Sequence, residues 1–217
     1  LSAFKPLMKK DSNGAGIIWN TPYSQYVRAE FSVGKTWRFG RRDGQAVATR
    51  FLAGAGYAYG NSDALPFEKH FYSGGASSLR GWQARAVGPG LAPLDRTFII
   101  ANQTGDMKLE ANIEYRFNMF WKVDGALFVD AGNVWTLRDT GGENSAASKL
   151  MMKTFAQSIA ADWGFGIRLD LNFLLLRVDM GMRLHDPARE AGRRWLRPGQ
   201  WLERDGFAVH FGVGYPF

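Results

Sequence analysis

Cysteine is absent from the 217 residues of this sequence. That absence excludes a disulfide framework, a thiolate zinc site and a thiol nucleophile. Histidine is almost as scarce, and His70, His185 and His210 lie far apart in the sequence, without the short spacing that is typical of metal ligands. We therefore expect neither a bound metal nor a cofactor.

Long apolar runs are missing as well. Although 46% of the residues are hydrophobic, no segment reaches the roughly 20 apolar residues that a membrane helix needs. The longest candidate, residues 169–176, is interrupted by Asp170 and Asn172. A membrane β-strand gives a much weaker signal, because its lipid-facing and lumen-facing positions alternate. The 26 glycines, 16 phenylalanines, 8 tryptophans and 7 tyrosines are typical of strands, tight bends and aromatic girdles.

The net charge of +7 is not concentrated in one stripe. Basic residues are spread along the chain, so we expect no nucleic-acid partner. They form a solvated surface or, in loops such as residues 189–195, a contact surface for membrane lipids and lipopolysaccharide. No signal peptide is visible at Leu1, where the chain starts in mid-pattern, and we interpret it as a mature fragment or a processed piece.

Alternation of apolar and polar residues is the strongest positive signal. In residues 107–117 the odd positions are Met, Leu, Ala, Ile, Tyr and Phe, and the even positions are Lys, Glu, Asn, Glu and Arg. Such a period of two predicts strands with one apolar face. Seven runs show it: 27–39, 47–59, 107–117, 123–131, 159–171, 174–184 and 207–217. Residues 17–19 either end an eighth strand or belong to irregular structure.

The connections between these runs alternate in length. Residues 40–46, 118–122 and 172–173 form short turns, whereas residues 60–106, 132–158 and 185–206 form long loops. Short periplasmic turns opposite long extracellular loops are typical of outer-membrane barrels. The sequence therefore predicts an all-β fold, an antiparallel transmembrane β-barrel, in a single domain over residues 1–217. We expect an aromatic girdle at the membrane interfaces, made of Trp37, Phe39, Tyr57, Tyr59, Phe117, Tyr215 and Phe217.

Three motifs carry a resemblance to a known family. The long loop contains FYSGGASSLRGW (residues 71–82), followed by VGPG (87–90), and farther on come NIEYRF (112–117) and GALFVDAGNVW (125–135). In this order, over about residues 60–217, the chain resembles the BamA/TamA superfamily of outer-membrane assembly and translocation factors. The resemblance implies the outer membrane of a Gram-negative bacterium. It also implies a barrel of sixteen strands, of which this chain supplies the C-terminal seven or eight.

Alternation places Glu114, Phe128 and Asp130 on the lumen face of two neighbouring strands. By resemblance, the loop of residues 60–106 folds back into the barrel and sets Arg80 between the two carboxylates, for which a forked guanidinium is suited. Phe128 would then seat the loop.

The resemblance gives the two residues after Arg80 a part in the same contact. Gly81 would let the loop backbone approach the wall closely, and Trp82 would pack against it. The residues alone also allow an alternative, in which Arg80 is solvated and the carboxylates pair with Arg116 or Arg168.

The last eight residues, HFGVGYPF, resemble the signal by which barrel proteins are recognised for assembly, with His210, Gly212, Tyr215 and Phe217 at its key positions. We expect residues 207–217 to close weakly against the first strand of the barrel, because Pro216 has no N–H for the ladder. Pro216 is equally consistent with a harmless strand end.

The barrel needs more strands than this chain provides. An eight-stranded barrel is filled by its own side chains and has no room for the long loop. An open sheet edge is not tolerated in lipid. The partners we expect are therefore missing barrel strands or a second chain, client outer-membrane proteins and periplasmic accessory proteins.

Three classes of function compete. The motifs favour a factor, not an enzyme, that inserts or folds other barrel proteins or moves a substrate across the membrane. A passive porin-like pore would show the same alternation but has no need of LRGW. A surface hydrolase would need a serine nucleophile beside a pair such as His185 and Asp186, and no serine has that context. The sequence does not distinguish barrel assembly from transport of lipid or passenger protein.

Overall fold

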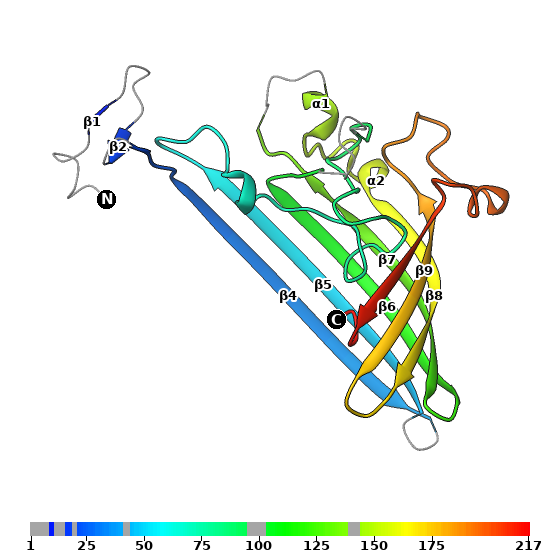
Figure 1. Cartoon of the computed structure of the whole chain (residues 1–217). Coiled ribbons are helices and arrows are strands. Elements are labelled where there is room, and N and C mark those ends of the chain that lie inside the picture. The colour runs from blue at the N-terminus through cyan, green and yellow to red at the C-terminus, as the bar shows by residue number, and fades with distance from the viewer. Residues whose placement is uncertain (1–8, 11–15, 19–20, 41–43, 95–102, 139–143) are drawn as a thin grey trace.

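A computed structural model describes residues 9–10, 16–18, 21–40, 44–94, 103–138 and 144–217. Its main feature is one antiparallel sheet of seven strands, which follow one another in chain order (Figure 1). The strands are β4 (Tyr26–Phe39), β5 (Gln45–Ala58), β6 (Met107–Phe120), β7 (Val123–Trp135), β8 (Ala160–Asp170), β9 (Leu175–His185) and β10 (Phe207–Val213). The prediction of an all-β fold with seven antiparallel neighbours is confirmed.

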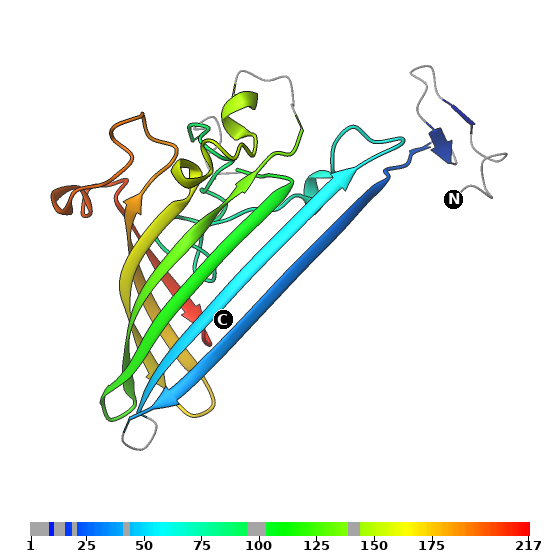
Figure 2. The ribbon, with the colours of Figure 1, turned by 180° about the vertical axis from the view of Figure 1, so that it is seen from behind.

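The sheet curves into a partial barrel whose long connections all lie at one end. Figure 2 shows these loops above the slanting strands and the short turns at the opposite end. The loops carry the short helices α1 (Ser145–Ser148) and α2 (Phe155–Ser158) and the 3-10 turns η3 (Phe67–Lys69) and η4 (Pro198–Gln200). No helix in the described parts of the chain has the length and apolarity to cross a bilayer.

The N-terminal segment does not add an eighth strand to this sheet. β2 (Gly16–Ile18) pairs with β1 (Lys9–Lys10) and β3 (Thr21–Pro22) in a separate small sheet. Trp19, the last residue of the candidate eighth strand, lies outside the described residues.

The faces of the main sheet follow the alternation of the sequence. Apolar side chains stand on the outer face without cover, and Phe31, Leu127 and Phe165 expose 61%, 48% and 46% of their surface. Charged side chains lie on the inner face, where Glu114 and Asp130 are fully buried. Water would disfavour this distribution, whereas a bilayer favours it. A sandwich is excluded because the seven strands form a single sheet.

The C-terminal strand ends earlier than predicted. β10 stops at Val213, and Gly214 has a φ of +80°, which an extended strand does not allow. Tyr215 and Phe217 then turn into the barrel, where the Arg116 guanidinium lies 4.1 Å and 6.0 Å from their ring centroids. The expectation that these two rings belong to the lipid-facing girdle is therefore wrong, because their attraction to a lumen arginine replaces the last strand pairs.

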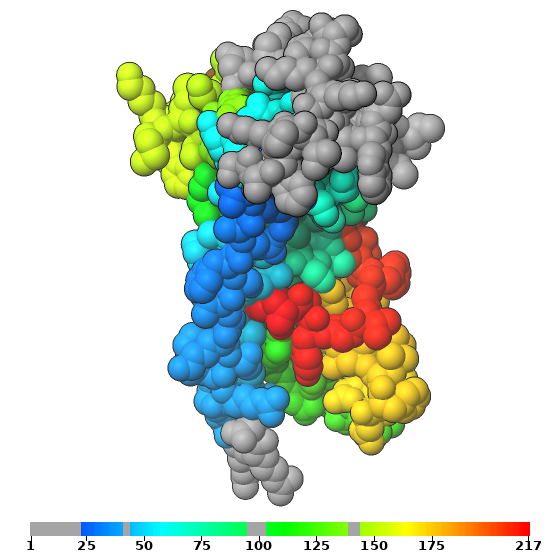
Figure 3. Space-filling view, turned by 90° about the vertical axis from the view of Figure 1, so that its left-hand side faces the viewer, coloured from blue at the N-terminus to red at the C-terminus, as the bar shows by residue number. Residues whose placement is uncertain are grey.

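Both borders of the sheet are open. β4 pairs with β5 and β10 with β9, and neither border strand has another partner strand among the described residues. Figure 3 looks onto this open side, where β4 in blue and β9 in yellow flank the red C-terminal segment and the blue-green loop. Six antiparallel pairings separate β4 from β10, so the two border strands run in the same direction.

Candidate functional site

The long loop has a small apolar core of its own where it meets the barrel wall. Leu79, Trp82 and Val87 of the loop pack with Ala160, the first residue of β8, and all four are buried. Short backbone bridges join Phe71 to Gly105 and Ser73 to Val87. These contacts give the loop a defined shape on the inner side of the sheet (Figure 1).

Arg80 projects from this loop into the wall and is fully buried. Its Nε donates to Asp130 Oδ2 at 2.8 Å and its Nη2 donates to Oδ1 at 3.0 Å. Its Nη1 donates to Glu114 on the neighbouring strand. The guanidinium carbon lies 3.5 Å from the centroid of the Phe128 ring. The structure thus brings together Arg80, Glu114, Phe128 and Asp130, four of the residues singled out in the sequence.

The Arg80 side chain is charged in this setting. Burial by itself lowers the pKa of a guanidinium, but the charges and hydrogen bonds of Asp130 and Glu114 outweigh it and raise the pKa of Arg80 above its ordinary value. A paired, fully buried charge of this kind is costly to leave without its partners. Moving Arg80 away from the two carboxylates is therefore unfavourable in free energy.

For Glu114 the alternative pairings with Arg116 and Arg168 also occur, in addition to the pairing with Arg80. Arg116 donates to Glu114 Oε1 at 2.7 Å and Arg168 donates to Glu114 Oε2 at 3.0 Å. Arg168 also forms an ion pair with Asp179 at 2.6 Å. Glu114 is consequently the centre of a network of three arginines, whereas Arg80 is not solvated.

Gly81 and Trp82 follow Arg80, and both contact the barrel wall, as expected. A Cβ at Gly81 would lie 2.7 Å from the Cβ of Asp162, so only glycine fits against β8 at this distance. Trp82 is buried in the core of the loop, and the Arg183 guanidinium lies 5.0 Å from its ring centroid. Gly81 thus contacts the wall with its backbone, and Trp82 packs against the wall with its ring while it also belongs to the core of the loop.

Comparison with known proteins places these features in a family. The family model described as the Omp85 superfamily domain matches residues 21–217. The chain belongs to the Omp85 superfamily. The resemblance to the BamA/TamA superfamily that the sequence motifs indicated is therefore confirmed.

A curated relative and a solved structure agree with this assignment. The outer membrane protein assembly factor BamA of Neisseria meningitidis is 30% identical over 129 residues, which are 57% of this chain and 16% of that protein. The structure of BamA from Haemophilus ducreyi lacking POTRA domains 1–3 superposes with a TM-score of 0.59 at 15% identity, over 92% of this chain and 37% of that one. The second likeness shows the fold, and this chain spans only a part of both relatives.

Several polar side chains of this Omp85 barrel hold the loop although sequence reasoning did not single them out. Ser73 Oγ donates to Glu110 at 2.6 Å, and Ser78 donates to the same carboxylate. Arg50 Nη2 donates to the carbonyl oxygen of Ser77 at 2.8 Å, and Asn112 Nδ2 to that of Ser78 at 2.9 Å. Three of these residues had a signal in the sequence, because Arg50, Glu110 and Asn112 occupy lumen-facing positions of the alternating runs.

The residues that resemble an assembly signal also lie on the inner side of the barrel. His210 Nε2 is 3.1 Å from the carbonyl oxygen of Arg80. Gly212 lies against Arg177, since a Cβ on it would come 2.8 Å from Arg177 Nε. Tyr215 and Phe217 stack over Arg116 as described above. All four residues of the signal therefore have defined contacts inside the barrel. Their recognition during assembly stays a prediction.

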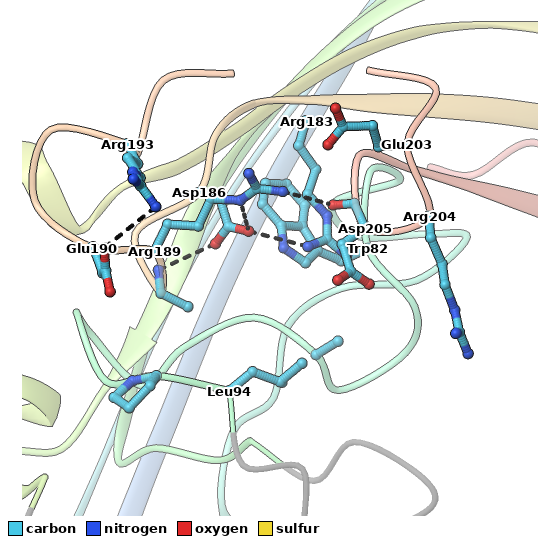
Figure 4. Close-up of a pocket in the computed structure, with 13 residues that line it drawn as sticks. Trp82, Leu94, Arg183, Asp186, Arg189, Glu190, Arg193, Glu203, Arg204 and Asp205 are labelled. Carbon is cyan, nitrogen blue, oxygen red and sulfur yellow. Dashed lines mark hydrogen bonds and ion pairs between the residues drawn. The ribbon is translucent and has the colours of Figure 1, made fainter. Parts of the chain in front are cut away.

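His185 and Asp186, the pair considered for a hydrolase, are engaged in the structure of their own loop. His185 Nδ1 lies 2.6 Å from the Ile159 carbonyl oxygen, and Asp186 pairs with Arg183 and Arg189 at 3.1 Å and 3.5 Å. Asp186 lines an open cleft of about 600 Å³ with Arg183 and Arg189 (Figure 4). No serine or histidine is among the described residues that line it. The described chain also has no cluster of three or more potential metal ligands of the His, Cys, Asp or Glu type.

Proposed function

We propose that this chain is the C-terminal part of the barrel of a factor that inserts or folds β-barrel proteins in the outer membrane of a Gram-negative bacterium. The observation that carries the proposal is the fully buried Arg80, held by Asp130 and Glu114. These buried ion pairs hold the loop in a defined position inside the barrel. A passive pore does not need such an attachment. The Neisseria relative is named an outer membrane protein assembly factor, which supports the same proposal.

The action requires no bond-making chemistry. A border strand of an open sheet presents a row of backbone donors and acceptors, and an incoming strand binds there by β-augmentation. β10 is such a border strand within this chain, and it forms only seven residue pairs with β9. A client strand that pairs with this border would begin its own sheet in register with the barrel.

The barrel is closed, in this proposal, by strands that a second copy of this chain does not supply. β4 and β10 run in the same direction, so joining β4 of one copy to β10 of another gives a parallel pair. Joining β4 to β4 is antiparallel but turns one copy over, which puts its long loops on the opposite side of the membrane. An all-antiparallel barrel instead needs an odd number of further strands with the common orientation, so we favour missing barrel strands over a second copy.

A pore is the weaker candidate because the long loop lies inside the lumen and is bound to its wall. Loop backbone or side chains bind Arg50 on β5, Asn112 on β6 and Asp130 on β7. A wide aqueous path would require these contacts to break. Membrane lipids on the outer face, lipopolysaccharide at the basic loops, client outer-membrane proteins and periplasmic accessory proteins complete the proposed set of partners.

The test uses the full-length protein in vesicles of zwitterionic phospholipid. A urea-unfolded eight-stranded barrel protein is added as the client, and its folding is followed by protease protection and by heat-modifiable migration on gels. We expect wild-type protein to accelerate folding over empty vesicles, and Arg80→Ala to lose most of the acceleration. Arg193→Ala, at an 81% exposed side chain, is the matched arginine control. Sugar permeation with no effect on client folding would instead identify a pore.

A further inference from the structure

The backbone of the loop tip is held by the last two strands, separately from the Arg80 side chain. Arg183 on β9 donates its Nε to the carbonyl oxygen of Gly81 at 3.0 Å. His210 on β10 lies with Nε2 3.1 Å from the carbonyl oxygen of Arg80. A carbonyl oxygen can only accept, so Nε2 carries the hydrogen of this bond. Two successive loop carbonyls are thus bound by side chains of β9 and β10.

Glycines on the inner face of these strands make room for this contact. A Cβ at Gly181 on β9 would lie 2.6 Å from the backbone nitrogen of Gly81, closer than real atoms approach. Gly212 on β10 lies against Arg177, which in turn donates to the Ala76 carbonyl oxygen at 2.8 Å. The wall of β9 and β10 is therefore shaped to receive the loop backbone.

The loop tip consequently spans strands that are not neighbours in the sheet. The Arg80 side chain binds β6 and β7 through Glu114 and Asp130, whereas its carbonyl oxygen binds β10 through His210. Among the residues that the structure describes, β10 pairs with β9 alone, and at seven residues it is the shortest of the seven strands. A short border strand opens at low free energy, so each additional contact changes its stability appreciably.

We propose that His210 is a positioning residue that fastens β10 to the long loop, so that seating Arg80 between Glu114 and Asp130 determines how firmly β10 stays on the barrel. The structural part of this inference is independent of the function. Its consequence rests on the proposed function: in an insertion factor, release of the loop would free the β10 border for a client strand.

Hydrogen exchange of the β10 backbone amides measures the effect directly in the full-length protein in vesicles. His210→Ala removes the donor, and we expect exchange over residues 207–213 to accelerate about two- to tenfold. His210→Gln keeps an N–H donor, so it should restore protection in large part. Phe211→Ala is the matched control, because it changes the same strand at a side chain that is 80% exposed on the outer face. Heat-modifiable migration confirms that each variant is folded.

A second measurement separates fastening from local packing. Asp130→Asn weakens the seat of Arg80 on β7, which is three places from β10 in the sheet. Fastening through the loop predicts faster exchange in β10 for Asp130→Asn, and little further change when His210→Ala is added, because both variants break the same connection. Additive effects, or unchanged β10 protection in Asp130→Asn, would overturn the proposal. Should client folding still depend on Arg80 in that case, the proposed function would stand without this coupling.

Discussion

Asp130 receives two parallel hydrogen bonds from one edge of the Arg80 guanidinium, at 2.8 Å and 3.0 Å, and a third from the Arg80 backbone nitrogen at 3.2 Å. Glu114 receives the remaining Nη1 donor. This division fixes the orientation of the guanidinium plane as well as its position, because each carboxylate takes a different side of the fork. The two carboxylates therefore set both the position and the orientation in which Arg80 holds the loop.

Arg80→Ala should release the loop while the barrel stays folded. Both carboxylates lose a buried partner, which costs about 3–5 kcal/mol in docking free energy. Arg80→Lys should rescue poorly, because an ammonium group cannot bind two carboxylates as a planar fork. Protease cleavage within residues 60–94 of the full-length protein, compared with gel migration of the barrel, measures both effects. Wild-type cleavage rates in both variants would contradict the proposed role of Arg80.

Asp130→Asn should mainly loosen the loop, whereas Glu114→Gln should also destabilise the barrel wall. Asp130 binds Arg80 and Asn112, so its neutralisation loosens the loop. Glu114 also pairs with Arg116 and Arg168, and Glu114→Gln leaves these wall arginines under-compensated. We expect the temperature of barrel unfolding on gels to fall clearly more for Glu114→Gln than for Asp130→Asn. An equal fall in both variants would contradict the inference that Glu114 stabilises the barrel wall more than Asp130 does.

Gly181→Ala should displace the loop without changing any charge. The new Cβ would overlap the Arg80–Gly81 backbone, and overpacking of this kind costs about 1–3 kcal/mol. Gly199→Ala is the matched control, since nothing lies within 4 Å of a Cβ there. Loop proteolysis should accelerate only in Gly181→Ala. Equal rates in the two variants would show that the wall yields to the methyl group.

The outer face of the sheet should be accessible to lipid. Cysteines at Phe31, Leu127 and Phe165, which are 61%, 48% and 46% exposed, should react with a lipid-soluble thiol reagent in the full-length protein. Ala126→Cys is the matched control, because Ala126 is adjacent to Leu127 but only 1% exposed on the inner face. Labelling of the three positions by water-soluble reagents alone would refute this orientation.

The sequence by itself determined the strands and their faces. A period of two is a local property, so residues such as Leu127 and Phe128 could be assigned to opposite faces before any strand was paired. The sequence also indicated that consecutive strands pair, because a short turn places the two strands that it joins side by side. Glu114 and Asp130 were placed on one face in this way, and the family resemblance suggested Arg80 as their partner.

Only the tertiary structure decided what the loop binds and where the last strand ends. Arg80 lies 34 and 50 residues from its carboxylate partners and 130 from His210, and no local pattern encodes such separations. The residues after Gly214 continue the period of two, yet they leave the sheet because lumen arginines attract their rings. Local alternation fixes which face a side chain occupies, whereas contacts across the lumen depend on how far the sheet curves.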